Sequence, residues 1–398
     1  MNYLVVAESC FLDKPGGAHR VAWDIARVMR DRGHTVYLLC YRSRADAPEG
    51  ITELEGIQVV RFQKASLPAW HPRRLQAIVD AAATACRRWL GGQRFDLVHV
   101  HTPLVGLGAV AALGETRAGG PRYVYTVHSP LVMEQEIMWR SQGWAGQLKL
   151  LLGKGLLAAA ERRMLEAASG IHTLSEFTRE QLDRAYGVGS RIAVIPHWYA
   201  RINQGVSRAE ARAALGWPQD AKIFFTVRAL GRRYGLDVAI RALAPLLPEH
   251  DGYFFLAGDG ELRPRLEALA AGLDPQKRIR FMGRISDPDL ELAYAAADLF
   301  ILPTLALECF GLITLEAFAF GCPVLSTDAG AIPESMAPIL PGLIVPAGDE
   351  GALRETARKF LHGQLSVPAG QALIEYAAGR YGAAVVIPRL CQLLERPA

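Results

Sequence analysis

The sequence lacks long apolar runs, paired cysteines and low-complexity tracts, and each absence excludes a class of protein. No window of about 18 apolar residues exists, so a membrane-spanning helix is not expected. The six cysteines are widely scattered without a C-x-x-C pair, which argues against a zinc site or a disulfide framework. The start, MNYLVVAESCF, has no charged segment before its apolar run and predicts a strand, not a signal peptide. Together these features predict a cytoplasmic protein.

Length and charge favour more than one domain. The 398 residues, 51% hydrophobic and 21% charged, are typical of a globular chain with two or three domains. Residues 1–200 hold 24 Lys and Arg against 18 Asp and Glu (+6), whereas residues 201–398 hold 20 against 22 (−2). The basic first half favours an anionic partner or membrane surface for that half, and ordinary variation in surface charge is the alternative explanation.

Short runs rich in Val, Ile and Leu alternate with helical patterns along the chain. The first series of runs covers residues 4–9, 35–41, 57–62, 96–101, 122–129, 170–175 and 191–196. After a break over 196–221, a second series covers residues 222–228, 253–258, 278–283, 299–304, 323–328 and 342–347. Repeated strand–helix units predict an α/β protein with two Rossmann-like, doubly wound parallel sheets. Such sheets bind ligands at the carboxyl ends of their strands, so we expect the site in a cleft between the domains.

The densest chemistry lies between residues 298 and 334. The pattern predicts a strand, a loop with Glu308, a helix that ends at Gly321, and a further strand. Glu316 falls about one turn inside this helix, so the two carboxylates cannot share a helix face. The helix starts with the amides of Phe310, Gly311 and Leu312. Free amides at the positive end of a helix dipole favour an anion such as a diphosphate.

These residues resemble a known signature. Glu308 and Glu316 form E-x7-E within ECFGLITLEA, which is followed by AFGCPVLSTDAGAIPE. This pattern is similar to that of the retaining glycosyltransferases of family 4, although Ala329 stands where the family has the first glycine of a pair. The resemblance implies the GT-B architecture, in which two Rossmann-like domains face a central cleft. It also implies transfer of a sugar from a nucleoside diphosphate sugar to a glycan, lipid-linked or small-molecule acceptor, with retention and without a metal or other cofactor.

The resemblance also assigns domains and donor-site residues. It implies an acceptor domain over 1–198, a donor domain over 199–380, and a C-terminal helix over 381–398 that returns to the first domain. Glu308 would be catalytic and face the donor sugar, and Glu316 would accept hydrogen bonds from the ribose hydroxyls, a role suited to a carboxylate. The residues implied at the diphosphate are Gly16, Gly17, Arg228, Arg233, Phe310, Gly311 and Leu312. Those implied near the ribose or base are Glu316, Gly258, Arg284 and Ile285.

Some positions depart from the family pattern or imitate another motif. Tyr234 stands where the family has a lysine on the diphosphate, and Arg233 is the candidate substitute. Asp287-Pro-Asp289 imitates a D-x-D metal motif, but a helix cap at Ser286 or Asp287 explains these residues, so no metal is expected.

The first domain carries the implied acceptor side. His128, at the end of a strand-like run, matches the family histidine near the reacting sugar and would be the second catalytic residue. His101 and Glu134 are further candidates on the acceptor side. Residues 137–166 mix Trp, Lys and Arg with Leu and predict peripheral contact with an anionic membrane, or a long helix packed on its own domain. The dispersed basic residues do not predict nucleic-acid binding.

Two other functions stay open at this point. A sugar-nucleotide epimerase or a phosphorylase of the same fold would use a similar donor site, and a catalytically silent protein would bind the nucleotide sugar without transfer. An epimerase would work without an acceptor, and a phosphorylase would need orthophosphate or a pyridoxal Lys. Donor turnover in Glu308→Ala and Glu316→Ala variants distinguishes an enzyme from a silent binding protein.

Overall fold

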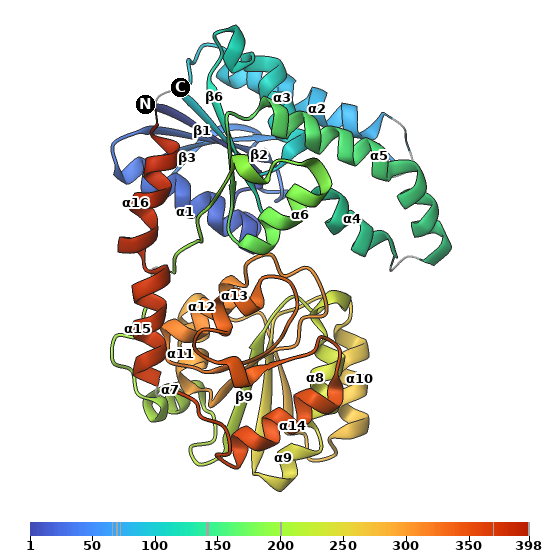
Figure 1. Cartoon of the computed structure of the whole chain (residues 1–398), viewed down its shortest axis with the longest axis vertical. Helices are drawn as coiled ribbons and strands as arrows, with labels where there is room; N and C mark the ends of the chain where they lie inside the picture. The colour runs from blue at the N-terminus through green and yellow to red at the C-terminus, as the bar shows by residue number, and fades with distance from the viewer. Residues whose placement is uncertain are drawn as a thin grey trace. The chain divides into compact units, whose positions relative to one another are not determined.

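The structure is a computed structural model that describes residues 1–65, 67–68, 71, 73–140, 143–199, 201–368 and 370–396. The chain divides into two compact units, one of Met1–Ile195 with Ile387–Ala398 and the other of Pro196–Val386. Each unit has its own sheet with helices packed on it (Figure 1). Within the described ranges, no helix is both long enough and apolar enough to cross a membrane.

Among the described residues, the first unit contains an eight-stranded sheet in the order β3-β4-β2-β1-β5-β6-β7-β8. Its strands are β1 (Asn2–Ser9), β2 (Thr35–Tyr41), β3 (Gly50–Leu54), β4 (Ile57–Phe62), β5 (Leu97–Val100), β6 (Arg122–Val127), β7 (Gly170–Thr173) and β8 (Ile192–Val194). Its helices are α1 (Gly17–Asp31), α2 (Arg74–Ala85), α3 (Pro103–Leu113), α4 (Leu131–Arg140), α5 (Gly143–Ala167) and α6 (Glu176–Tyr186). The central strands are buried along almost their whole length, as expected for a parallel sheet covered on both faces.

The edge strand β3 is the antiparallel strand in the otherwise parallel sheet of the first unit. It pairs antiparallel with β4 through a tight turn at Glu55 and Gly56, both of which have positive φ. The side chains of β3 alternate between more and less exposed positions, because an edge strand contacts the core on one face. Its short run of five residues, which includes Glu53, did not stand out in the sequence as a strand.

In the described part of the second unit, a six-stranded, wholly parallel sheet has the order β11-β10-β9-β12-β13-β14. Its strands are β9 (Lys222–Val227), β10 (Gly252–Ala257), β11 (Ile279–Gly283), β12 (Leu299–Leu302), β13 (Val324–Thr327) and β14 (Ile344–Val345). Its helices are α7 (Arg208–Leu215), α8 (Leu236–Leu243), α9 (Leu246–Glu249), α10 (Arg263–Leu273), α11 (Asp287–Ala296), α12 (Leu312–Ala319), α13 (Ile332–Met336), α14 (Glu350–Leu361) and α15 (Gly370–Tyr381). The prediction of two α/β units is therefore confirmed.

The last helix, α16 (Ala383–Leu394), begins in the second unit and ends in the first. The Arg122 guanidinium at the start of β6 donates to the carbonyl oxygens of Leu393 and Leu394 at 2.5 and 3.0 Å. Arg32, just after α1, donates to both carboxylate oxygens of Glu395 at 2.6 and 2.8 Å. These contacts fix the end of the chain to the first unit.

The order of the strands determines where each sheet can bind a ligand. In the second unit the chain proceeds from β9 to β10 and β11 on one side, and then from β12 to β13 and β14 on the other. The order therefore reverses between β9 and β12, and ligands bind beyond the carboxyl ends of the strands at such a reversal. The first unit has the corresponding reversal between β1 and β5.

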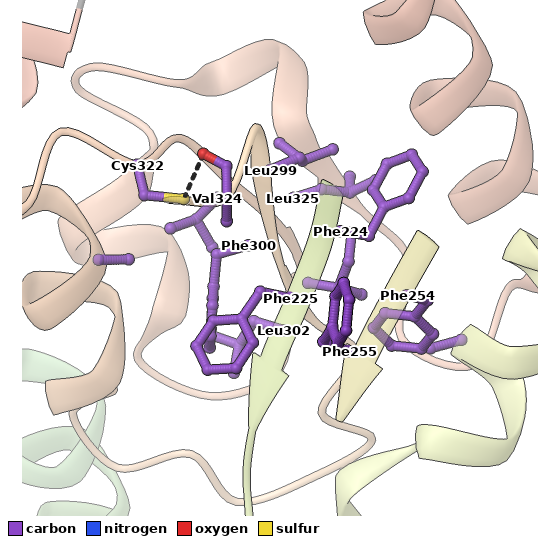
Figure 2. Packing of buried hydrophobic residues seen from close by; sticks show 14 of the residues in the cluster. Phe224, Phe225, Phe254, Phe255, Leu299, Phe300, Leu302, Cys322, Val324 and Leu325 are labelled. Atoms are coloured by element: carbon purple, nitrogen blue, oxygen red, sulfur yellow. Dashed lines mark hydrogen bonds between the residues drawn. The ribbon is translucent and has the colours of Figure 1, made fainter. Parts of the chain in front are cut away.

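Aromatic rings fill the core of the second unit on β9, β10 and β12 (Figure 2). Phe300 is fully buried, with its ring centre 5.7 Å from that of Phe225 and 5.4 Å from that of Tyr294. Trp217 stacks on Phe255 with a separation of 4.1 Å between ring centres. Close-packed aromatic rings therefore hold β9, β10 and β12 in fixed positions relative to one another.

We expect Phe300→Ala to lower the free energy of unfolding of the second unit by about 3–5 kcal/mol, because it removes buried apolar area and leaves a cavity. Leu273→Ala is the matched control, since Leu273 is 45% exposed. Calorimetric and denaturant unfolding of both variants measures the difference. Equal losses in the two variants would contradict this account of the core.

Candidate active site

A buried ion pair joins the two sides of the strand reversal in the second unit. Arg228 follows β9 directly, and Glu308 lies in the loop after β12. The Nη2 atom of Arg228 donates to Oε2 of Glu308 at 2.6 Å, and the two side chains are only 8% and 18% exposed. The sequence assigned these residues to different parts of the donor, and the structure brings them into direct contact. Removal of one partner would leave a charge uncompensated in a largely buried place, which costs about 3–5 kcal/mol.

The backbone of Glu308 is fixed from the loop after β13. The amide of Ala331 donates to the carbonyl oxygen of Glu308 at 2.7 Å. Gly330 has a φ of +63°, and a Cβ at this position would lie 2.2 Å from the same oxygen. Glycine is therefore required at 330. The preceding Ala329 departs from the family pattern but is buried and leaves this contact intact.

The N-terminus of α12 lies directly after this loop. Gly311 precedes the helix with a φ of +76°, and Leu312 is its first residue, as the sequence predicted. Among the residues that the structure describes, Nη1 of Arg228 is buried and has no hydrogen-bond partner. A buried donor without a partner costs about 1–3 kcal/mol. This cost would be removed by an acceptor from a ligand.

Glu316, inside α12, is held by a residue that the sequence did not indicate. The hydroxyl of Tyr294 on α11 donates to Oε2 of Glu316 at 2.9 Å. Tyr294 is fully buried, and this burial, together with the nearby Glu316 carboxylate, raises its pKa well above the ordinary value. The phenol therefore stays a hydrogen-bond donor, and it orients the carboxylate that we expect at the ribose.

The turn at 232–234 contacts the same loop as Glu308. The guanidinium of Arg233 donates to the hydroxyl of Tyr234 at 3.0 Å and to the carbonyl oxygen of Leu307 at 3.3 Å. The guanidinium carbon of Arg228 lies 4.5 Å from the centre of the Tyr234 ring. The departure at Tyr234 thus lies between the two arginines that the sequence assigned to the diphosphate.

The remaining predicted donor residues lie at the ends of β10 and β11. The amide of Gly258 donates to the carbonyl oxygen of Gly283 at 2.7 Å, and a Cβ at Gly258 would lie 1.9 Å from the carbonyl oxygen of Arg228. Arg284 is exposed and Ile285 half-buried just after β11. These residues share the carboxyl edge of the sheet with Arg228 because all its strands are parallel.

The Asp287-Pro-Asp289 segment is a helix start. The hydroxyl of Ser286 accepts a hydrogen bond from the amide of Asp289 at 3.2 Å and caps α11. The described residues contain no group of three or more His, Cys, Asp or Glu side chains arranged to hold a metal ion.

In the first unit, the predicted residues follow β1, β5 and β6 at the carboxyl edge of the sheet. Nδ1 of His101 and Nε2 of His128 are 2.9 Å apart, and the two rings stack. Glu134 on α4 accepts a hydrogen bond from the hydroxyl of Ser129 at 2.7 Å. The two predicted glycines come just before and at the start of α1, where a Cβ on Gly17 would meet no other atom within 4 Å. Packing within the protein therefore does not require a glycine at position 17.

A buried chain of hydrogen bonds below these histidines was not predicted. Nε2 of His172 donates to the carbonyl oxygen of Ile195 at 2.8 Å, because a carbonyl oxygen can only accept, and Nδ1 of His172 is hydrogen-bonded to the hydroxyl of Thr126 at 2.8 Å. The Thr126 oxygen is also hydrogen-bonded to Nε2 of His99, and Nδ1 of His99 is hydrogen-bonded to the hydroxyl of Tyr3, both at 2.6 Å. Burial, followed by the electrostatic influence of His172, lowers the pKa of His99 well below its ordinary value, so the His99 ring is neutral.

Glu161 on α5 is a buried carboxylate that the sequence analysis did not predict. It is fully buried and accepts hydrogen bonds from the amide of Leu131 at 2.9 Å and from the hydroxyl of Tyr186 at 2.7 Å. Burial raises its pKa to about 6, against the lowering effect of these two hydrogen bonds. Glu161 joins α4 to α5 and α6.

Comparisons with known proteins identify the family of the chain. The family model described as "Glycosyltransferase Family 4" matches residues 15–199, and that described as "Glycosyl transferases group 1" matches residues 207–380. A phosphatidyl-myo-inositol mannosyltransferase of Mycobacterium leprae is 28% identical over 392 residues, which cover 97% of this chain and 94% of the relative. A 2-deoxystreptamine glucosyltransferase of Streptomyces kanamyceticus is 28% identical over 81% of this chain and 83% of its own.

Solved structures show the same fold. A sucrose-phosphate synthase from Thermosynechococcus elongatus aligns with a TM-score of 0.80 at 21% identity over 99% of this chain and 98% of its own. The Anabaena protein HepE in complex with UDP-glucose aligns with a TM-score of 0.74 at 20% identity over 99% of each chain. The fold is therefore that of the GT-B transferases. Since the two family models together span most of the sequence, the chain belongs to family 4 of the glycosyltransferases.

Glu161 makes the stability of the first unit depend on pH. Its pKa is higher in the folded state than the unperturbed 4.5, so its contribution to stability is complete below pH 4.5 and is lost as the pH rises through 6. Relative to the wild type, Glu161→Gln should therefore gain about 1 kcal/mol between about pH 5 and pH 7.5. Glu166→Gln is the control, because Glu166 is exposed on the same helix. Thermal unfolding at both pH values tests this, and a constant difference between wild type and Glu161→Gln would contradict it.

Proposed function

We propose that this glycosyltransferase uses a nucleoside diphosphate sugar as donor and binds it at the carboxyl edge of the second unit, with retention at the anomeric carbon. The observation that carries the donor site is the buried, unpartnered Nη1 of Arg228. This donor belongs to a guanidinium that is already paired with Glu308 through Nη2. A phosphate oxygen is the acceptor that such a geometry suits best, because guanidinium groups form strong, charge-assisted hydrogen bonds to phosphate.

The diphosphate then lies among three sources of positive potential. Arg228 and Arg233 supply full charges, and the amides at the start of α12 supply the positive end of a helix dipole. Transfer of the sugar leaves a nucleoside diphosphate with increased negative charge. Preorganised donors around that charge lower the barrier, so these groups both bind the donor and stabilise the leaving group. No metal or other cofactor is part of this proposal.

The two carboxylates have separate tasks in this arrangement. Glu316, oriented by Tyr294, accepts hydrogen bonds from the ribose hydroxyls, and Gly258, Arg284 and Ile285 border the nucleoside. Glu308, held by Arg228 and by the amide of Ala331, accepts hydrogen bonds from the donor sugar near the reacting carbon. We assign the acceptor to the first unit, where His101, His128 and Glu134 gather beyond the ends of β5 and β6.

The relatives support this proposal and suggest where an acceptor screen should start. HepE was solved with UDP-glucose, which supports a nucleotide-sugar donor. The names of the relatives include phosphatidyl-myo-inositol, D-inositol 3-phosphate and 2-deoxystreptamine, which all contain a substituted cyclohexane ring. Cyclitols and their phosphate or lipid derivatives are therefore the first acceptors to test.

The test measures donor binding and transfer separately. UDP, GDP, ADP and their sugars are screened by thermal shift, because a ligand that binds the native state raises its stability. Glu308→Gln should retain binding of the matching nucleotide but lower kcat by at least about 100-fold, since the carboxylate acts mainly on the reacting sugar. Glu355→Gln, on the surface helix α14, is the control.

Each other result has a defined meaning. Binding without transfer to any acceptor would favour the catalytically silent protein. Conversion of the donor sugar without an acceptor would favour an epimerase, and a requirement for orthophosphate a phosphorylase. Full activity of Glu308→Gln would overturn the role assigned to Glu308.

We also propose that the first unit contacts an anionic membrane surface through α5 and the end of α4. Trp144, Leu148 and Leu151 follow one another at intervals of four and three residues, so they lie on one face of α5. They are 82%, 49% and 80% exposed, and Met138 on α4 is 52% exposed. The two helices together hold five Lys and Arg against four Glu, a net charge of only +1. We therefore expect the apolar stripe formed by Trp144, Leu148 and Leu151 to contribute more to membrane binding than the charge does.

Flotation with vesicles of anionic or neutral phospholipid at low salt tests this contact. Leu151→Asp should lower the bound fraction at least about fivefold, because it places a charge within the apolar stripe. Leu273→Asp, at an exposed position of α10 in the other unit, should bind like the wild type. Absence of wild-type binding to anionic vesicles would overturn the proposal.

A further inference from the structure

Tyr234 contacts both arginines of the proposed diphosphate site. The guanidinium carbon of Arg228 lies 4.5 Å from the centre of its ring, and that of Arg233 lies 4.9 Å away. The face of an aromatic ring carries negative charge density and attracts a cation at these distances. The hydroxyl of Tyr234 also accepts a hydrogen bond from Nη2 of Arg233 at 3.0 Å. One side chain therefore contacts two like-charged groups that would otherwise repel one another.

The turn that carries Tyr234 is fixed on both sides. The carbonyl oxygen of Arg233 accepts a hydrogen bond from the amide of Leu305 at 2.8 Å, and its guanidinium donates to the carbonyl oxygen of Leu307. Gly235 has a φ of +64°, and a Cβ there would lie 2.0 Å from the carbonyl oxygen of Pro303. Residues other than glycine cannot adopt this close approach without a backbone shift. Tyr234 is thus held against the loop that leads to Glu308.

We propose that Tyr234 is a positioning residue of the donor site, which orders Arg228 and Arg233 before the diphosphate arrives. This inference rests on the donor site proposed above. Arginine side chains lose much rotamer freedom when a ligand immobilises them, and groups that are already ordered bind more tightly because less of that freedom is lost. The ring orders both guanidinium planes, and the hydroxyl fixes the one on Arg233.

The proposal distinguishes a tyrosine from a lysine at this position. A lysine at 234 would add a third positive charge, but its ammonium group offers no ring on which the guanidiniums can stack. If charge alone determined affinity, Tyr234→Lys would bind a nucleoside diphosphate more tightly than the wild type. If Tyr234 acts through the two arginines, the same variant binds it more weakly.

The experiment uses the full chain and measures Kd by calorimetry for UDP, GDP and ADP, and KM and kcat with the matching nucleotide sugar. Tyr234→Phe keeps the ring and loses one hydrogen bond, so it should weaken binding about two- to fivefold. Tyr234→Leu loses both and should weaken binding by about tenfold or more, and Tyr234→Lys should also weaken it. In these variants KM for the donor should rise by a larger factor than kcat falls.

Tyr253→Leu is the matched control. Tyr253 also lies under an arginine, with the guanidinium carbon of Arg278 5.2 Å from its ring centre, but near the amino end of β10, at the opposite edge of the sheet. Its replacement should leave the Kd of the nucleotide unchanged. Thermal unfolding of every variant shows whether it is folded, and Tyr234→Phe, which lacks only an oxygen atom, tests the proposal if Tyr234→Leu does not fold.

The outcomes separate this inference from the proposed function. If the wild type binds a nucleotide and Tyr234→Lys or a folded Tyr234→Leu binds it equally well or more tightly, the role of Tyr234 is overturned and the donor site stands. If the wild type binds none of the three nucleotides, the donor site itself is overturned and the inference falls with it. A rise in donor KM that only the Tyr234 variants show supports the inference.

Discussion

The ion pair between Arg228 and Glu308 is the interaction on which the arrangement of the candidate active site depends. It joins the ends of β9 and β12, the two strands at which the order of the sheet reverses. Charges that are largely removed from water are stable only when they are paired, so the segments that carry them must converge. Gly330 permits the close approach that fixes the backbone of Glu308, and Gly235 allows the arginine turn to pack on the same loop. The sheet, the glycines and the aromatic core below them all support this one contact.

The first unit stabilises its strand ends by different means. Its hydrogen-bond chain from Tyr3 to the carbonyl of Ile195 is buried, and it crosses β1, β5, β6 and β7. A neutral ring avoids the desolvation cost of a buried charge. Burial lowers the pKa of His99 well below its ordinary value, so its ring stays neutral. His101 follows two residues after His99, and His128 two after Thr126, so the chain fixes the strands from which the acceptor-side histidines extend.

Two departures from the family pattern have a physical explanation in the structure. Ala329 is tolerated because the close approach to Glu308 occurs at the next residue, Gly330, which is a glycine. Tyr234 is not a cation, but it contacts two. At 329 the glycine that the close approach requires is present at the next position, and at 234 an aromatic ring contacts two arginines where the family pattern has a cation. A motif comparison by position alone would count both as losses.

The sequence by itself determined the strand runs, the start of α12, the two α/β units and the family, because burial patterns, caps and the E-x7-E motif are encoded in neighbouring residues. It missed β3, a short edge strand in which buried or half-buried positions alternate with exposed ones. The tertiary structure alone decided that Arg228 pairs with Glu308, 80 residues away, that Tyr294 orients Glu316, and that Glu161 is buried between helices. Contacts between distant residues depend on which strand ends are neighbours, and that is fixed by the order of strands in the sheet, which local pattern does not specify.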